Sequence, residues 1–208
     1  MINPEETISN LKGKLKPLIG YSFGFDMASR SPMKYVLSCG YCSSAITNGE
    51  EVNIINLYDD YWIYMNITFN PYEEIVKRGP TKTNYNIMFS LSLFHGEYVD
   101  QKKQLFRAEW DNYEKDESLH PQPHWHFYIN EEENKTSTFN ETIEDEDIGF
   151  YQSLKNENKE FQKMHFAMNG QWSANEGHMH RIKESDSFVE WVFGLVDHIY
   201  TQLKYIDK

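Results

Sequence analysis

The chain has 208 residues and a net charge of −12, so it is long enough for one good-sized domain and is strongly acidic. This charge repels phosphate backbones, and because Lys and Arg form no run, non-specific nucleic-acid binding is disfavoured. No apolar run approaches the roughly 18 residues of a membrane span, and the polar N-terminus lacks the pattern of a signal peptide. We therefore expect a cytoplasmic protein with no membrane segment.

Helical signals stand at both ends of the chain. A capping residue, a proline and two glutamates predict a helix over 3–16, which Pro17 should end. Near the C-terminus, apolar residues recur at helical spacing over 187–206, and Ser187 with Glu190 fits a capping box. Such a wide apolar stripe needs a large apolar surface on which to pack.

Strand signals dominate the middle of the chain. Alternating β-branched and aromatic residues predict a hairpin over 51–69 that turns at Asp59, followed by another strand over 85–94. Their short connections favour antiparallel neighbours. The prediction is therefore a single α+β domain over 1–208, with a mainly antiparallel sheet, an N-terminal helix and a long amphipathic C-terminal helix packed on the sheet. An acidic, solvated loop is expected over 131–147.

Residues 105–130 predict the two strands that carry the candidate site. Side chains alternate between the two faces of a strand, so His124 and His126 share one face of the second strand. Arg107 and Glu109 share one face of the first strand in the same way. If the strands pair and bury their apolar faces together, two imidazoles stand beside a guanidinium and two carboxylates, those of Glu109 and Asp111.

These residue types suit a divalent metal ion. Imidazole and carboxylate together are ligands for zinc, manganese or iron(II). His165 alternates with apolar residues of another expected strand and should fall on its polar face. The metal hypothesis therefore uses His124, His126, His165 and Glu109, with an open position that could activate water.

A metal-free hypothesis uses the same face. His124 or His126 would act as general base, oriented by Glu109, and Arg107 would hold an anionic group in bidentate fashion. The matching reaction is hydrolysis of a phosphodiester or a related acid–base transfer, on a small phosphate-containing ligand. The expected catalytic set is His124, His126, Glu109, Arg107 and His165.

A second group of residues could join this cluster. His178, His180 and Arg181 lie at the end of a glycine-flanked loop, and His120 precedes a proline. If the loop folds over the sheet, its two imidazoles and its guanidinium reach the first cluster. The alternative for residues 178–181 is a solvent-exposed turn. The alternative for His120 is a hydrogen bond within a turn of its own.

The order of these motifs resembles a group of small bacterial proteins. The shared features are an acidic strand after Arg107, the run from His120 to His126 that reads His-Pro-x-x-His-x-His, the His180-Arg-Ile triplet and an aromatic-rich terminal helix. The resemblance covers about the C-terminal half of the chain. It implies a bacterial, cytoplasmic origin and brings no established activity with it.

An alternative function is a non-catalytic subunit, or a protein-interaction module, of a larger bacterial assembly. Aromatic side chains dominate the energetics of protein interfaces. The candidate anchors lie near the predicted hairpin turn and are Tyr58, Tyr61, Trp62 and Tyr64. The competing interpretation is that these rings pack within the sheet.

Cys39 and Cys42 have the spacing of a redox motif or of half a zinc site. A site of four cysteines is excluded within one chain, because the sequence has only 2. A redox motif should open a helix, and residues 43–47 begin a helix poorly. We therefore expect two buried free cysteines in a reducing compartment.

Overall fold

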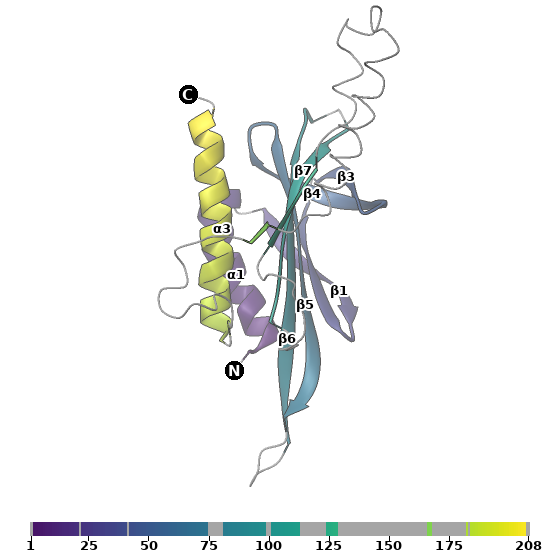
Figure 1. Cartoon of the computed structure of the whole chain (residues 1–208), viewed down its shortest axis with the longest axis vertical. Coiled ribbons are helices and arrows are strands. Elements are labelled where there is room, and N and C mark those ends of the chain that lie inside the picture. Colours follow the sequence, from purple (N-terminus) through teal and green to yellow (C-terminus); the bar gives the residue numbers. More distant parts are fainter. Residues whose placement is uncertain are drawn as a thin grey trace, which may run out of the picture.

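Among the residues that the computed structural model describes, two helices lie on one side of an antiparallel sheet (Figure 1). The structure describes residues 2–20, 22–40, 42–74, 81–98, 101–112, 124–128, 166–167, 182 and 184–206. The strands are β1 (Phe23–Arg30), β2 (Met33–Cys39), β3 (Ser43–Thr47), β4 (Glu50–Tyr58), β5 (Tyr61–Glu74), β6 (Lys82–His95), β7 (Lys103–Asp111), β8 (His124–Phe127) and β9 (Phe166–Ala167). The predicted α+β fold is confirmed.

The N-terminal helix α1 (Pro4–Ile19) begins where its capping signals predict. The expectation that Pro17 ends it is wrong, because the helix continues to Ile19. A proline in the last turn removes one amide donor, and the turn still closes through Gly20 N–H, which donates to Lys16 O at 2.9 Å. The helix buries Leu11 and Leu15 completely against the sheet side.

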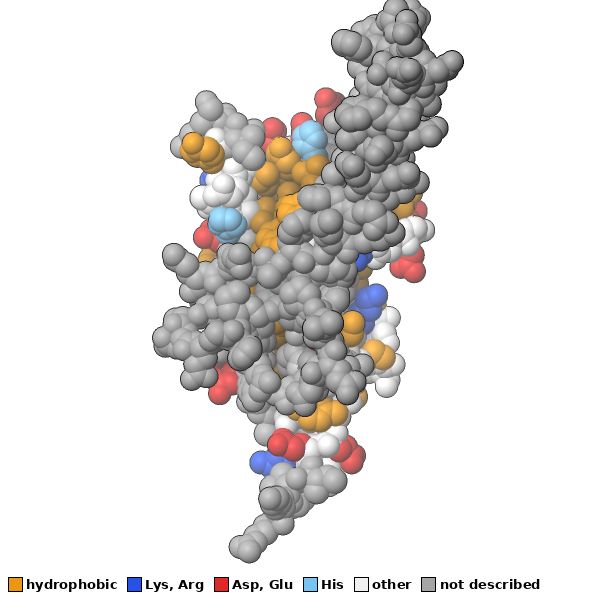
Figure 2. Space-filling model, viewed as in Figure 1, with side chains coloured by type: hydrophobic (Ala, Val, Ile, Leu, Met, Phe, Trp, Pro, Cys, Tyr) orange, Lys and Arg blue, Asp and Glu red, His pale blue; other side chains and the backbone are white. Residues whose placement is uncertain are grey.

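The C-terminal helix α3 (Ser185–Ile206) packs its aromatic residues against the sheet, as predicted. The ring centroid of Trp191 lies 5.2 Å from that of Phe89 in β6, and Phe188 lies 5.6 Å from Trp110 in β7. Figure 2 shows hydrophobic side chains gathered between the helices and the strands. The predicted capping box at Ser187 is wrong. The helix begins at Ser185, so Ser187 lies inside its first turn. No helix in the described ranges is long and apolar enough to cross a membrane.

The predicted hairpin over 51–69 is confirmed as β4 and β5, with Asp59 in the turn at φ 46°. The start of β5 pairs with β4 through residues 61–63, and its middle pairs with β2 through residues 66–69. Because β5 serves two partners, the β3–β4 hairpin departs from the main sheet. It projects from the face opposite the helices (Figure 1).

The β3–β4 hairpin curls back until it meets β7. Ala45 of β3 forms a parallel bridge with Lys102, just before β7 begins. A second, smaller core of Ala45, Ile54, Trp62 and Phe94 fills the space beneath it. The strands from β3 to β7 therefore form a curled sheet, which brings the tip of the hairpin over the polar face of β7.

The two cysteines lie at the end of β2 and just before β3. The structure joins Cys39 and Cys42 in a disulfide with a Cα–Cα distance of 5.7 Å, which lies in the usual range for such bonds. The prediction of two free cysteines is therefore wrong. Their bonding is a pairing that the spacing alone did not reveal.

Candidate functional site

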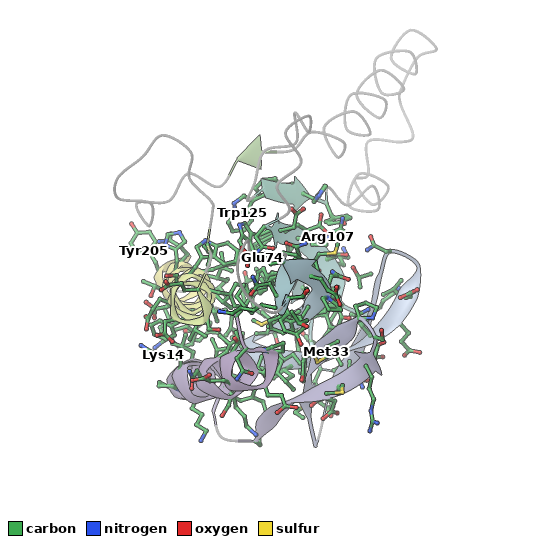
Figure 3. All side chains as sticks on the ribbon, turned by 90° about the horizontal axis from the view of Figure 1, so that it is seen from below. Lys14, Met33, Glu74, Arg107, Trp125 and Tyr205 are labelled. Carbon is green, nitrogen blue, oxygen red and sulfur yellow. A yellow bond between two sulfur atoms is a disulfide. The ribbon has the colours of Figure 1, made fainter. Side chains whose placement is uncertain are left out.

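The candidate site lies on the sheet face that points away from the helices. Strands β7 and β8 pair antiparallel, with Arg107 opposite His126 and Glu109 opposite His124. Between them on the other face, Ala108 is fully buried in the main core. In Figure 3, Trp125 lies toward α3 while Arg107 lies on the far side of the strands. The predicted pairing and alternation of these two strands are confirmed.

The same register continues across β6 and β5. One row of facing residues runs through Tyr64, Ser92, Arg107 and His126. A neighbouring row runs through Asn66, Ser90, Glu109 and His124. Neighbouring strands are about 4.8 Å apart, so each row brings polar residues of β5, β6 and β7 to register positions beside β8.

Glu109 contacts both Arg107 and His126. One carboxylate oxygen, Oε1, lies 2.9 Å from Nε of Arg107, and the other, Oε2, lies 2.9 Å from Nε2 of His126. The side chains of Arg107 and His126 are only 14% and 13% exposed, whereas Glu109 is 33% exposed. Partial burial strengthens these charge interactions relative to a fully solvated pair. The sequence predicted this contact set from strand alternation alone.

The Arg107 guanidinium has a second partner that the sequence did not predict. Its Nη1 donates to Oδ1 of Asn48, at the tip of the β3–β4 hairpin, at 2.6 Å. Within the described residues, the Nε–H group of Arg107 forms no hydrogen bond of good geometry, so its contact with Glu109 is an ion pair. The available signal was the Asn48-Gly49 dipeptide, which predicts a hairpin turn but not the strand that its tip will reach.

A buried polar layer supports the hairpin beside the site. Gln104 Nε2 donates to Ser92 Oγ at 2.9 Å, and Thr47 Oγ1 donates to Gln104 Oε1 at 3.0 Å. Ser92 is 1% exposed and Thr47 is 7% exposed, so an unpaired group here would be costly. These hydrogen bonds join β3 to β7 and hold the hairpin tip near Arg107.

Tyr128 follows β8 on the same face as His126. Its backbone N–H donates to Leu105 O at 2.9 Å, which fixes the end of the strand against β7. Burial raises the pKa of its phenol; Arg107 opposes that rise, and Glu109 adds to it. Tyr128 is therefore a neutral hydrogen-bonding group within the electrostatic reach of the ion-paired residues.

Several predicted site residues lie outside the described residues. These are His120, His165, His178, His180 and Arg181, together with the expected acidic loop over 131–147. For His124, the backbone pairs opposite Glu109. Among the residues that the structure describes, no group of 3 or more His, Cys, Asp or Glu side chains could hold a metal ion. The metal site of His124, His126, His165 and Glu109 therefore stays a prediction.

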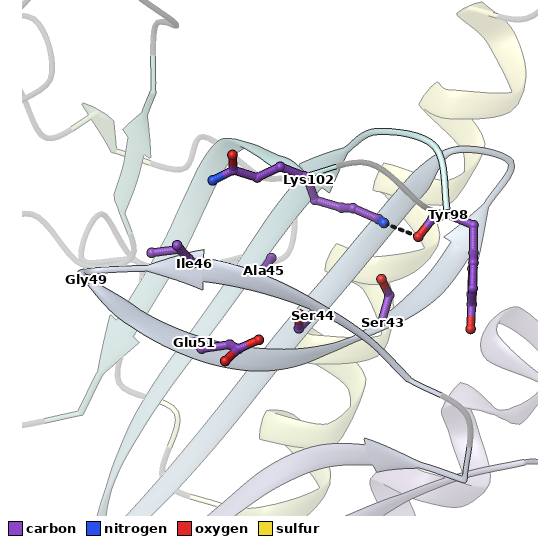
Figure 4. A pocket seen from close by; sticks show the side chains of 9 residues that line it. Ser43, Ser44, Ala45, Ile46, Gly49, Glu51, Tyr98 and Lys102 are labelled. Carbon is purple, nitrogen blue, oxygen red and sulfur yellow. Dashed lines mark hydrogen bonds between the residues drawn. The ribbon is translucent and has the colours of Figure 1, made fainter.

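A surface hollow of about 560 Å³ lies along β3, between the β3–β4 hairpin and the segment that leads into β7 (Figure 4). Its lining includes Ser43, Glu51 and Lys102. Lys102 is 4% exposed, and its ammonium donates to Tyr98 O at 2.6 Å and lies 5.0 Å from the centre of the Trp62 ring. Because its lining includes neither Glu109 nor His126, the hollow is separate from the predicted site.

The aromatic residues near the β4–β5 turn are used for internal packing. Trp62 is 5% exposed, and its indole N–H donates to Gly96 O at 2.8 Å. Tyr58 makes an edge contact with Tyr200 of α3 at 5.8 Å. These contacts favour packing within the fold over the role of interface anchors that the subunit hypothesis gave to these side chains.

Comparison with known proteins does not assign the chain to a family. No protein-family model, no curated protein and no solved structure matches this chain. The resemblance to bacterial proteins with a His-Pro-x-x-His-x-His signature therefore stays a prediction.

Proposed function

We propose that this chain is a histidine-dependent hydrolase that acts on phosphodiesters or related esters by acid–base chemistry. The observation that carries the proposal is the bridging position of Glu109, with one oxygen 2.9 Å from Arg107 and the other 2.9 Å from His126. A general base needs a partner that fixes its ring, and an anionic substrate needs a fixed cation nearby. Both needs are met on one polar sheet face.

His126 is the proposed general base. When its Nε2 carries the proton and donates to Glu109, the basic nitrogen of the ring is Nδ1. That nitrogen would accept a proton from the attacking water as the new phosphorus–oxygen bond forms. The bond to the leaving alcohol then breaks, and a proton returns to the leaving oxygen. The carboxylate of Glu109 stabilises the imidazolium that exists between these two proton transfers.

Arg107 is the proposed binding group for the non-bridging phosphate oxygens. Guanidinium groups suit phosphate because their planar set of donors matches its oxygens. Asn48 and Glu109 contact two different nitrogens of this guanidinium and limit its rotation. A group that is already oriented loses less entropy when the substrate binds.

The test is hydrolysis of bis(4-nitrophenyl) phosphate by protein purified without a histidine tag. His126→Gln should lower kcat at least about 100-fold, the lower range for loss of a general base. Arg107→Lys should mainly raise KM, because the ammonium cannot bind in bidentate fashion. Elemental analysis of the same preparation separates the metal-dependent from the metal-free version. If His126→Gln hydrolyses the diester as fast as the parent does, His126 is not the general base.

A further inference from the structure

The tip of the β3–β4 hairpin is a tight turn with an unusual backbone. Asn48 has φ 52° and Gly49 has φ 79°, so both residues lie in the left-handed region. A two-residue hairpin loop of this kind accepts Asn and Gly readily and most other residues poorly. The turn is closed by the pairing of Thr47 with Glu50. These requirements alone would explain an Asn-Gly pair at this place.

The Asn48 side chain does more than the turn requires. Its Oδ1 accepts a hydrogen bond from Nη1 of Arg107 at 2.6 Å, across 59 residues of sequence. The hairpin is fixed to β7 nearby, through Thr47 with Gln104 at 3.0 Å and through the Ala45–Lys102 bridge. The amide therefore holds Arg107 from the hairpin side, while Glu109 contacts the same guanidinium from within β7.

The chemistry of an amide matters at this contact. A carboxylate at position 48 would orient the guanidinium equally well, but it would also neutralise its charge and compete with Glu109. The amide oxygen accepts the hydrogen bond and adds no net charge. Arg107 already has one anionic partner, so a second would leave little positive potential for a substrate.

We propose that Asn48 is a positioning residue for Arg107, and that its neutral amide keeps the guanidinium oriented and available to an anionic phosphate. This inference rests on the proposed function and extends it to the hairpin. It assigns to Asn48 an effect on substrate binding that is separate from its role in the turn.

Two variants separate these roles. Asn48→Gly preserves the turn, since Gly adopts the same backbone, and removes the acceptor. Asn48→Asp preserves the acceptor, tolerates the left-handed region and adds a negative charge. Asn53→Asp is the matched control, because it adds the same charge to an exposed position of the same hairpin. Circular dichroism and thermal midpoints establish that all three variants fold.

The measurement is KM and kcat for bis(4-nitrophenyl) phosphate, with inorganic phosphate as competitive inhibitor. Loss of one hydrogen bond should raise KM about fivefold in Asn48→Gly, and the added charge should raise it on the order of tenfold or more in Asn48→Asp. The inhibition constant of phosphate should rise in parallel, with kcat little changed. Asn53→Asp should match the parent.

Different failures have different meanings. If His126→Gln abolishes turnover but Asn48→Asp binds phosphate like the parent, the positioning role is overturned and the proposed function stands. If Asn48→Gly weakens binding while Asn48→Asp does not, charge neutrality is irrelevant and the inference is also overturned. A parent that neither hydrolyses the diester nor binds phosphate removes the proposed function, and this inference with it.

Discussion

The carboxylate of Glu109 lies 2.9 Å from Nε2 of His126, across the pair formed by β7 and β8. The two residues are not directly opposite each other, because Glu109 pairs with His124 and His126 pairs with Arg107. The contact is therefore diagonal, which a carboxylate and an imidazole are long enough to span. It ties β8, a strand of only 4 residues, to the sheet through side chains as well as through the backbone.

A double-mutant cycle measures this contact. We expect Glu109→Gln and His126→Gln each to lower the free energy of unfolding, and the double variant to lose less than the sum. The coupling should be about 1 kcal/mol, because the pair is partly buried and partly screened by solvent. Urea unfolding of the four proteins at neutral pH gives the value. Additive losses would show that the two side chains do not interact in solution.

A second contact joins the beginnings of the two helices. The Thr7 hydroxyl donates to Asn3 O at 2.6 Å and lies 2.8 Å from Ser185 Oγ, while Asn3 N–H donates to the same serine oxygen at 3.2 Å. Thr7 is completely buried. The first turns of α1 and α3 therefore meet through a small network of hydrogen bonds.

Thr7→Val should destabilise the fold by about 1 to 2 kcal/mol, because the shape is kept while the partly buried network loses the hydrogen bonds of the Thr7 hydroxyl. Chemical denaturation gives the change in free energy. Thr201→Val, at an exposed position of α3, makes the same substitution without this network and serves as the control. Equal effects of the two substitutions would contradict a role for the network.

Strand alternation made most of the candidate site predictable. The faces of residues 105–111 and 124–128 follow from a period of two, and an apolar core on one side places Arg107, Glu109 and His126 on the other. The C-terminal helix was predictable for a similar reason, because five turns of apolar spacing need a sheet to cover. Local periodicity carried this information.

The remaining parts depend on contacts between distant segments. Nothing in the spacing of residues 43–49 indicates that β3 will meet β7, because that meeting depends on how β5 divides its length between β2 and β4. Asn48 and the Thr47–Gln104 pair could therefore not be assigned to the site. The helix end at Pro17 was misplaced for a smaller reason, since one lost amide donor in a last turn is tolerated.

Phe188 should be among the side chains most important for stability. It is fully buried and its ring contacts those of Phe89, Trp110 and Trp191 at centroid distances of 6.0, 5.6 and 6.4 Å. Phe188→Ala should cost about 3 to 5 kcal/mol, the range for deleting a buried aromatic ring. Tyr205→Ala, at a position of the same helix that is 75% exposed, should change the free energy of unfolding by less than about 0.5 kcal/mol. Thermal and urea unfolding test both values.

Tyr35 should make the fold sensitive to alkaline pH. Burial, then Glu5 and then Tyr85, raise the pKa of its phenol above the ordinary value of 10.0. Among the described residues its hydroxyl has no hydrogen-bond partner, and the side chain is 5% exposed. In the window between the unfolded and the folded pKa, the native state binds more protons than the unfolded state. The stability that depends on the neutral phenol is therefore complete below the unfolded pKa and is lost as pH rises through the folded pKa.

Tyr35→Phe removes both the ionisation and the unpaired hydroxyl. The variant should be as stable as the parent or up to about 1 kcal/mol more stable near neutral pH, because a buried polar atom without a partner costs free energy. Between pH values of about 8 and about 11, on either side of the ordinary tyrosine pKa, it should lose less stability than the parent. Urea midpoints at the two pH values give the comparison. A loss as large as that of the parent would mean that the Tyr35 phenol ionises with equal ease in the folded and unfolded chains.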